Sequence, residues 1–156
     1  MTNKKLRLIL QNTVLGALYV ALTYINPISS GILQLRISTL LMGVPFLKPQ
    51  LAPGLILGVM IANIPSPFGW LDILGGFLIQ TVSLYVFNRL FKSNYVKALA
   101  YGLWCGVVVS SVIKLAAGAP FWPTFLSVAL SNILVACLGV FLVDKYLKPI
   151  LDRYVD

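Results

Sequence analysis

The sequence predicts an all-α protein: a single integral membrane domain over residues 1–156, in which six transmembrane helices form one bundle. The composition indicates this class first, because only 10% of the residues are charged and the mean hydropathy is +0.92. A water-soluble domain of this size with that balance would aggregate. The second observation is a series of long uncharged runs, since a helix needs about 20 mainly apolar residues to cross the bilayer. These runs cover residues 8–25, 51–69, 73–88, 98–113 and 115–143.

The first helix is predicted over residues 7–25. Lys4, Lys5 and Arg7 at its start could form the basic region of a signal peptide. The apolar run that follows is longer than the ~7–15 residues usual in such peptides, and no A-x-A cleavage pattern comes after it. We therefore expect a transmembrane helix that is retained.

The other helices are separated by segments rich in proline, glycine and charged residues, which interrupt helices. NPISSG ends the first helix, and LKPQ divides the next stretch into helices over about 36–48 and 50–64. PSPFGW precedes a helix over about 70–91, and KSNYVK precedes one over about 97–117. GAPFWP introduces the last helix, over about 124–146. No linker is long enough to separate a second domain.

The distribution of Lys and Arg tests this arrangement, since both are enriched in cytoplasmic loops. With six spans and a cytoplasmic N-terminus, ten of the 12 Lys and Arg residues fall on the cytoplasmic side. Only Arg36 and Lys114 fall on the other side. The sequence therefore predicts that both termini are cytoplasmic.

Three charged residues lie in the outer halves of the predicted helices: Arg36, Asp72 and Lys114. A charge at that depth is costly unless it reaches the interface, pairs with an opposite charge or lines a wet cavity, so intramembrane ionisable residues commonly mark functional sites. Two interpretations stay open. The three residues could snorkel or pair with one another, for instance Arg36 with Asp72, or they could line a wet pocket.

The composition also excludes several classes of function. The chain has no histidine and four acidic residues, so acid–base pairs and metal-ligand clusters are missing, and we expect neither an enzyme nor a bound metal or cofactor. No G-x-x-x-x-G-K-[ST] loop is present to cradle ATP. The net charge of +8 does not indicate nucleic-acid binding, because the basic residues bracket the apolar runs.

Three stretches resemble the queuosine-precursor transporter (QueT) family, whose members are substrate-binding S-components of energy-coupling factor (ECF) transporters. LQLRISTLLMGVPFL, around residues 34–47, is similar to the family's Q-F-R-I-S-E-A-L run. GLILGVMIANIPSPFGWLDILGG, residues 54–76, is similar to its G-L-x-x-G-x-x-I-A-N-x-x-S-P-x-G-x-x-D run and is the most specific of the three. GAPFWPTFLSVALSNILVACLG, residues 118–139, is similar to a region that opens with P-F-W and continues into the last helix.

The resemblance implies a six-helix, multi-pass protein of the bacterial plasma membrane that captures a small 7-deazaguanine, typically 7-aminomethyl-7-deazaguanine, from outside. It also implies a transmembrane coupling subunit and two cytoplasmic ATPases as partners. The family offers an A-x-x-x-A face of the first helix to the coupling subunit, and Ala17 and Ala21 match that pattern. A second stripe of small residues, Gly54, Gly58 and Ala62, is better explained by packing inside the bundle.

A flat heterocycle requires a slot of apolar and aromatic groups with a few hydrogen-bonding groups at its edge. Gln and Asn suit this edge because each can donate and accept. For tryptophan, a place in the interfacial aromatic belt is the alternative to ligand contact. The candidate substrate-binding residues at the outer ends of the helices are Gln34, Arg36, Ser38, Asn63, Asp72, Trp122 and Asn132.

Two positions depart from the family's pattern, because Thr39 and Asn132 stand where the family has glutamates. Those carboxylates would be natural partners for a cationic aminomethyl group, and taking an uncompensated ammonium out of water is costly. On the outer side, Asp72 is the one acidic residue left that could pair with a cationic group. Three alternatives therefore stay open: the aminomethyl compound, a different neutral or anionic vitamin-like solute, and a membrane partner protein without a ligand.

Overall fold

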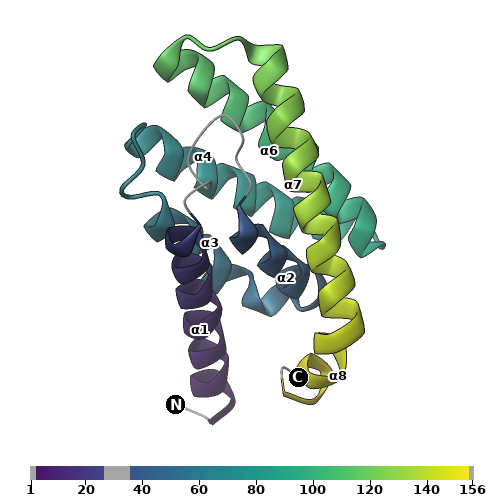
Figure 1. The fold of residues 1–156 in the computed structure, drawn as a ribbon. Coiled ribbons are helices and arrows are strands. Elements are labelled where there is room, and N and C mark those ends of the chain that lie inside the picture. Colours follow the sequence, from purple (N-terminus) through teal and green to yellow (C-terminus); the bar gives the residue numbers. More distant parts are fainter. Residues whose placement is uncertain (1–2, 27–35, 155–156) are drawn as a thin grey trace.

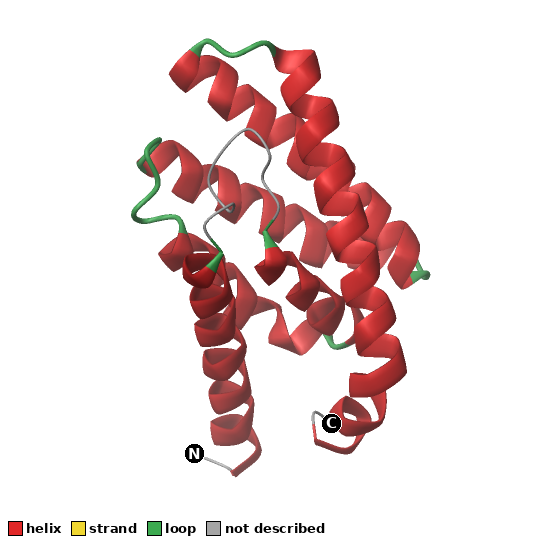
Figure 2. Cartoon of the chain, in the orientation of Figure 1, coloured by secondary structure: helices red, strands yellow, loops and turns green. Residues whose placement is uncertain are grey.

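The computed structural model describes residues 3–26 and 36–154, in which helices are joined by short turns (Figures 1 and 2). Four helical stretches in this part are long and apolar enough to cross a membrane, which confirms an all-helical, multi-pass membrane protein. They are α1 (Asn3–Ile25), α4 (Trp70–Thr81) with η3 (Val82–Phe87) and α5 (Asn88–Leu90), α6 (Asn94–Ala117), and α7 (Phe121–Leu142) with η4 (Val143–Leu147) and α8 (Lys148–Tyr154).

The helices predicted over 36–48 and 50–64 form two shorter apolar stretches, which are separated at Lys48. Each covers about 20 Å at the usual helical rise, less than the ~30 Å of a bilayer's hydrocarbon core. The prediction of six full spans is therefore not confirmed, and four spans are supported. In order, the short stretches consist of η1 (Ile37–Met42) and α2 (Gly43–Leu47), then η2 (Pro49–Leu51) and α3 (Ala52–Ala62).

The start of α1 and the end of α8 lie at one end of the molecule, and the turns after α3 and α6 lie toward the other, which we call the distal end (Figure 1). The turn after α6 uses Gly118 with a φ of 66°, a left-handed conformation that favours glycine, and its N–H donates to the Lys114 carbonyl at 3.0 Å. Which end faces the cytoplasm stays a prediction, as does the division of the chain into one domain.

α1 and α3 pack together at a glycine seam formed by Gly16, Gly54 and Gly58. A Cβ added to Gly54 would lie 2.2 Å from the Asn12 carbonyl oxygen, and one added to Gly16 would lie 2.6 Å from the Gly54 carbonyl oxygen. Backbones approach this closely only where side chains are absent. The Asn12 side chain fixes the contact, because its Oδ1 accepts the Gly54 N–H at 2.7 Å and its Nδ2 donates to the Gln50 carbonyl at 3.1 Å. The predicted packing role is confirmed for Gly54 and Gly58.

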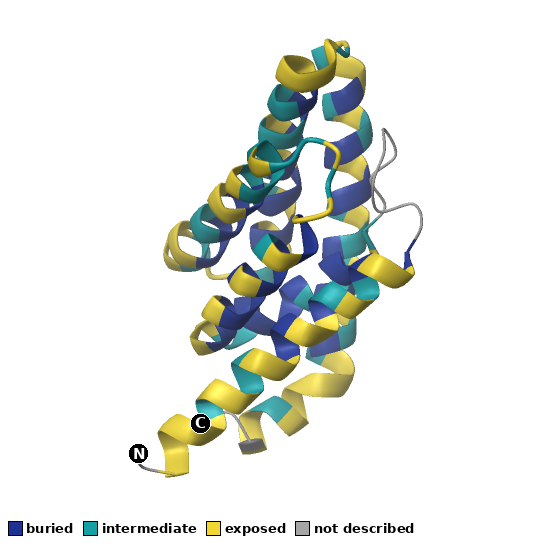
Figure 3. Ribbon diagram, turned by 90° about the vertical axis from the view of Figure 1, so that its left-hand side faces the viewer, coloured by how far each residue is buried: buried dark blue, intermediate teal, exposed yellow. Residues whose placement is uncertain are grey.

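The interior and the outer surface of the bundle are both apolar. Buried residues line the inner faces of the helices and exposed residues their outer faces (Figure 3). Many of the exposed residues are large and apolar. Leu10 on α1 and Leu134 on α7, for example, are 57% and 69% exposed. Because lipid tails cover this outside surface, polar groups are concentrated inside the bundle, where they need partners.

Candidate functional site

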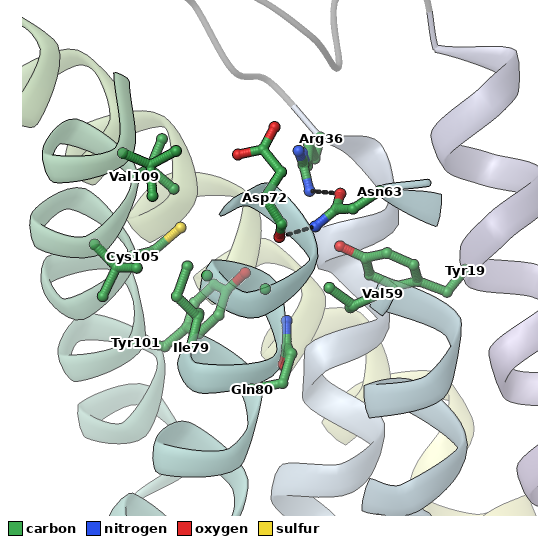
Figure 4. Close-up of a pocket in the computed structure, with 14 residues that line it drawn as sticks. Tyr19, Arg36, Val59, Asn63, Asp72, Ile79, Gln80, Tyr101, Cys105 and Val109 are labelled. Carbon is green, nitrogen blue, oxygen red and sulfur yellow. Dashed lines mark hydrogen bonds between the residues drawn. The ribbon is translucent and has the colours of Figure 1, made fainter. Parts of the chain in front are cut away.

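A narrow cavity lies between α1, α3, α4 and α6 toward the distal end (Figure 4). Its volume is about 30 Å³, room for about two water molecules. Helical periodicity gathers the lining side chains, because residues three or four apart share one face of a helix. The lining consists of Tyr19, Arg36, Val59, Asn63, Asp72, Gly75, Gly76, Ile79, Gln80, Tyr101, Cys105, Val108, Val109 and Val112.

Three predicted site residues meet at the distal end of this cavity, which we call its mouth. Arg36 Nη1 donates to Asn63 Oδ1 at 3.0 Å, and Asn63 Nδ2 donates to the Asp72 backbone carbonyl at 2.8 Å (Figure 4). The Ser66 hydroxyl donates to the Asp72 carboxylate. A single buried amide thus connects the guanidinium to the segment that carries the carboxylate.

The ends of the surrounding helices position these three residues. Arg36 directly precedes η1, Asn63 directly follows α3, and Asp72 lies in the first turn of α4, where a helix N-terminus favours negative charge. Gly69, with a φ of 56°, directly precedes α4. A Cβ on Gly76 would lie 2.6 Å from Asn63 Nδ2, so glycine at this position leaves room for the amide that joins the other two residues.

The inner end of the cavity, its floor, carries a second amide. Gln80 lies eight residues after Asp72 on α4, about 12 Å along the helix axis. Its side chain is directed toward the cavity and is only 2% exposed (Figure 4). Its Oε1 has no hydrogen-bond partner in the protein. Leaving such a buried group unpaired costs about 1–3 kcal/mol, so the floor retains unused hydrogen-bonding capacity.

Two tyrosines complete the polar lining. Tyr19 on α1 and Tyr101 on α6 are 1% and 3% exposed. The Tyr19 side chain lies next to Arg36, and the Tyr101 side chain lies next to Thr39. Their rings and hydroxyls therefore lie beside the cavity on two different helices, and both can contact a flat ligand.

Asn132 and Ser38, both predicted to bind substrate, lie behind the cavity wall and do not line it. Asn132 Oδ1 accepts a 3.4 Å hydrogen bond from Thr39 Oγ1, and Thr39 in turn contacts the lining residue Tyr101. The two positions where the family resemblance implies glutamates therefore contact each other here as a neutral pair. Ser38 Oγ accepts a 2.8 Å hydrogen bond from Thr23 Oγ1.

The remaining predicted residues lie elsewhere. Trp122 is 70% exposed and packs edge-on against Phe121, with ring centroids 5.4 Å apart. It does not line this cavity, and its exposure fits the alternative of an interfacial belt. Gln34 lies outside the described residues. Ala17 and Ala21 are exposed on α1, next to the helix positions that form the glycine seam.

The sequence analysis missed Gln80 and the two tyrosines. A signal for Gln80 exists, because Asp72, Gly76 and Gln80 recur every four residues in an apolar stretch and so share one helix face. No comparable signal exists for Tyr19 and Tyr101, since an aromatic residue in a membrane helix can face lipid as well as the interior.

The cavity combines polar groups at its two ends with apolar walls between them. Arg36, Asn63 and Asp72 provide donors, an acceptor and a negative charge at one end, Gln80 provides an amide at the other, and valines and glycines form the walls between them. Within residues 3–26 and 36–154, no group of three or more His, Cys, Asp or Glu side chains could hold a metal ion.

Comparison with known proteins identifies a family of transporters. The family model described as QueT transporter matches residues 9–148. The protein named "Queuosine precursor transporter QueT" from Lactococcus lactis subsp. cremoris (strain MG1363) is 29% identical over 154 residues, covering 88% of this chain and 90% of that relative. No solved structure matches the chain.

Proposed function

The chain belongs to the QueT transporter family, and we propose that it is the substrate-binding S-component of an ECF-type importer that captures a queuosine precursor. The proposed substrate is 7-aminomethyl-7-deazaguanine or a close relative of it. The name of the Lactococcus protein, a queuosine precursor transporter, supports this substrate class. The family consists of transporters, so the chain is not an enzyme.

The mouth of the cavity is the observation that carries the proposal. Asp72 is the acidic residue in the lining, and its carboxylate can pair with the ammonium of an aminomethyl group. Arg36, which donates to Asn63, places a planar positive charge at the mouth beside the proposed ligand. Charges inside a membrane helix bundle are costly and commonly line solute pathways, which is the use we propose for this pair.

The substrate requires a wider cavity than the present one. Sites for small ligands usually measure roughly 300–1,000 Å³, far more than the space between these side chains. We propose that α4 and α6 separate when the ligand enters. Gly75 on α4 faces Val108 and Val112 on α6, where even an added Cβ would make only van der Waals contacts, at 3.6 and 3.5 Å. Such contacts can part without breaking hydrogen bonds.

Energy for uptake would come from partner subunits, because the sequence has no phosphate-binding loop of its own. We propose a transmembrane coupling subunit and two cytoplasmic ATPases as these partners. Ala17 and Ala21 are exposed on α1, so their small side chains are available for close contact with another membrane helix.

A second candidate is a neutral or anionic solute. Thr39 and Asn132 form an uncharged pair behind the lining, where the family resemblance implies two carboxylates. A site with fewer negative charges favours a ligand with less positive charge. Asp72 is the observation against this candidate, because its carboxylate lines the mouth.

Calorimetry on the full chain in lipid nanodiscs distinguishes the two candidates. The ligands are 7-aminomethyl-7-deazaguanine, its neutral 7-cyano counterpart, guanine and a panel of vitamins. We expect the aminomethyl compound to bind most tightly, and Asp72→Asn to weaken its binding about tenfold or more, since a charge-assisted hydrogen bond is lost. If the 7-cyano compound or a vitamin binds more tightly, the second candidate replaces the first.

A further inference from the structure

The amide of Gln80 has no role in holding the fold together that the structure shows. It is 2% exposed, its Oε1 lacks a partner, and its side chain is directed toward the cavity between α4 and α6 (Figure 4). Most buried side-chain polar groups in proteins are hydrogen-bonded, so each exception calls for an explanation. Asn63, at the opposite end of the same cavity, uses both its Oδ1 and its Nδ2 in contacts within the protein.

We infer that the Gln80 amide forms hydrogen bonds with the edge of the substrate ring. The substrate then lies with this edge at the floor of the cavity and its charged substituent at the mouth. This inference rests on the proposed function. A primary amide has one acceptor and a donor group side by side, which matches a lactam edge, where a ring C=O lies next to a ring N–H. In a 7-deazaguanine the N–H of this edge lies in the six-membered ring and points away from the five-membered ring, which carries the 7-substituent.

The two ends of the cavity differ in charge, which fixes the orientation. Arg36 and Asp72 are both at the mouth, whereas Gln80 at the floor is neutral. A cationic substituent is stabilised near Asp72 and would be poorly stabilised at the floor. The neutral ring edge suits the floor, because its N–H can donate to the unpaired Gln80 Oε1 and no charge has to be buried there.

The walls between the two ends suit the flat faces of a ring system. Val59, Ile79, Val108 and Val109 are apolar, and Gly75 and Gly76 add no side chain beyond the helix backbone. Apolar walls with polar groups at two ends are the usual construction of a site for a planar, amphipathic ligand. The lining residues thus favour one orientation of the ring along α4, from Asp72 to Gln80.

Replacement of Gln80 by Met tests the inference, because Met is close to Gln in length and volume but makes no comparable hydrogen bonds. Calorimetry on the full chain in nanodiscs would use 7-aminomethyl-7-deazaguanine, the 7-cyano compound and an N1-methyl derivative of the aminomethyl compound. We expect Gln80→Met to weaken binding of the aminomethyl and cyano compounds by a similar factor, about ten- to hundredfold, because both have the same ring edge. Asp72→Asn should weaken the aminomethyl compound alone.

The N1-methyl derivative isolates the edge contact. Wild type should prefer the unmethylated ring by about tenfold or more. This preference should disappear in Gln80→Met, because N1-methylation of the ligand and Gln80→Met each remove the same hydrogen bond, one from the ligand and one from the protein. Ser83→Ala is the matched control, because Ser83 is also fully buried with an unpaired hydroxyl on the same helical stretch, yet it does not line the cavity. It should leave all three affinities unchanged.

Thermal unfolding without ligand gives a second, independent readout. Removing a buried amide whose Oε1 is unpaired should raise the melting temperature of ligand-free Gln80→Met above that of wild type. The additional shift caused by ligand should shrink. Equal affinities in wild type and Gln80→Met, or a preference for the unmethylated ring that survives the substitution, would overturn the inference and leave the proposed function standing. If wild type binds none of the deazaguanines, the proposed function fails and this inference fails with it.

Discussion

Glycines have opposite effects in two regions of this molecule, the glycine seam between α1 and α3 and the cavity between α4 and α6. At the seam, Gly16 faces Gly54, and the missing side chains let the two backbones touch. At the cavity, Gly76 faces the Asn63 amide and Gly75 faces valine side chains, so the missing Cβ atoms leave space for other groups. The same residue type therefore closes space or keeps it open, depending on what faces it.

Polar side chains show the same contrast. Asn12 at the seam uses both amide atoms to hold α1 against the start of α3. Gln80 at the cavity floor leaves its Oε1 unpaired. A satisfied buried amide contributes to stability, whereas an unsatisfied one lowers it. The seam thus adds stability, and the cavity floor retains unused hydrogen-bonding capacity at some cost to stability.

The largest expected loss of stability comes from a substitution in the glycine seam. In Gly54→Ala, the new Cβ would lie 2.2 Å from the Asn12 carbonyl oxygen, and neither backbone can move without separating α1 from α3. We expect a loss of about 1–3 kcal/mol of stability, measured by thermal unfolding in detergent. Gly75→Ala is the control, since its Cβ meets only ordinary contacts at 3.5 Å or more. Equal stability of the two variants would contradict this account of the seam.

Arg36→Lys tests the charged end of the cavity. Arginine donates to Asn63 from a planar fork with several N–H groups, whereas lysine has a single ammonium on a flexible stem. We expect ligand affinity in calorimetry to fall about tenfold or more, since a charged hydrogen bond contributes roughly 1.5–3 kcal/mol. Unchanged binding would remove Arg36 from the site and favour an interfacial anchor, for which lysine is an adequate substitute.

Gly76→Ala tests whether the glycine beside Asn63 matters for ligand binding more than for stability. Its Cβ would lie 2.6 Å from Asn63 Nδ2 and 2.8 Å from Val59 Cγ1, both side-chain atoms that can shift. We therefore expect a smaller stability loss than at Gly54, together with several-fold weaker binding because Asn63 is displaced from Arg36. Ser83→Ala, at a residue that does not line the cavity, serves as the control in the same binding assay. If both variants bind ligand equally well, the position of Asn63 does not matter.

The smallest expected effect on the isolated protein is at Ala17, one residue after Gly16 in the seam. Ala17 is exposed on α1, so Ala17→Leu should change stability by less than about 0.5 kcal/mol. The same substitution should reduce copurification with the proposed coupling subunit, because the bulkier side chain keeps a second helix away. Normal copurification with unchanged uptake in cells would place that partner on another surface.

The sequence alone identified the mouth of the cavity because charge is costly in lipid in any fold. Arg36 and Asp72 stand out in apolar stretches, and the pattern around Asn63 resembles a known family. The structure brings all three together. The long helices were predictable for the same reason, since about 20 apolar residues need a membrane whatever their neighbours are. The stretches over 36–48 and 50–64 are helical as predicted, but both are short, so the sequence did not establish that they span the bilayer.

Only the tertiary structure decided which neutral side chains face inward. Trp122 is exposed and Tyr101 is buried, although each lies in an apolar helix and neither carries a charge that fixes its direction. The rotation of each helix about its axis settles this, and contacts distant in sequence set that rotation, such as the approach of Gly16 to Gly54. Charge and hydropathy therefore determined from sequence that this chain lies in a membrane and where it is polar, and helix packing determined which of its polar groups meet.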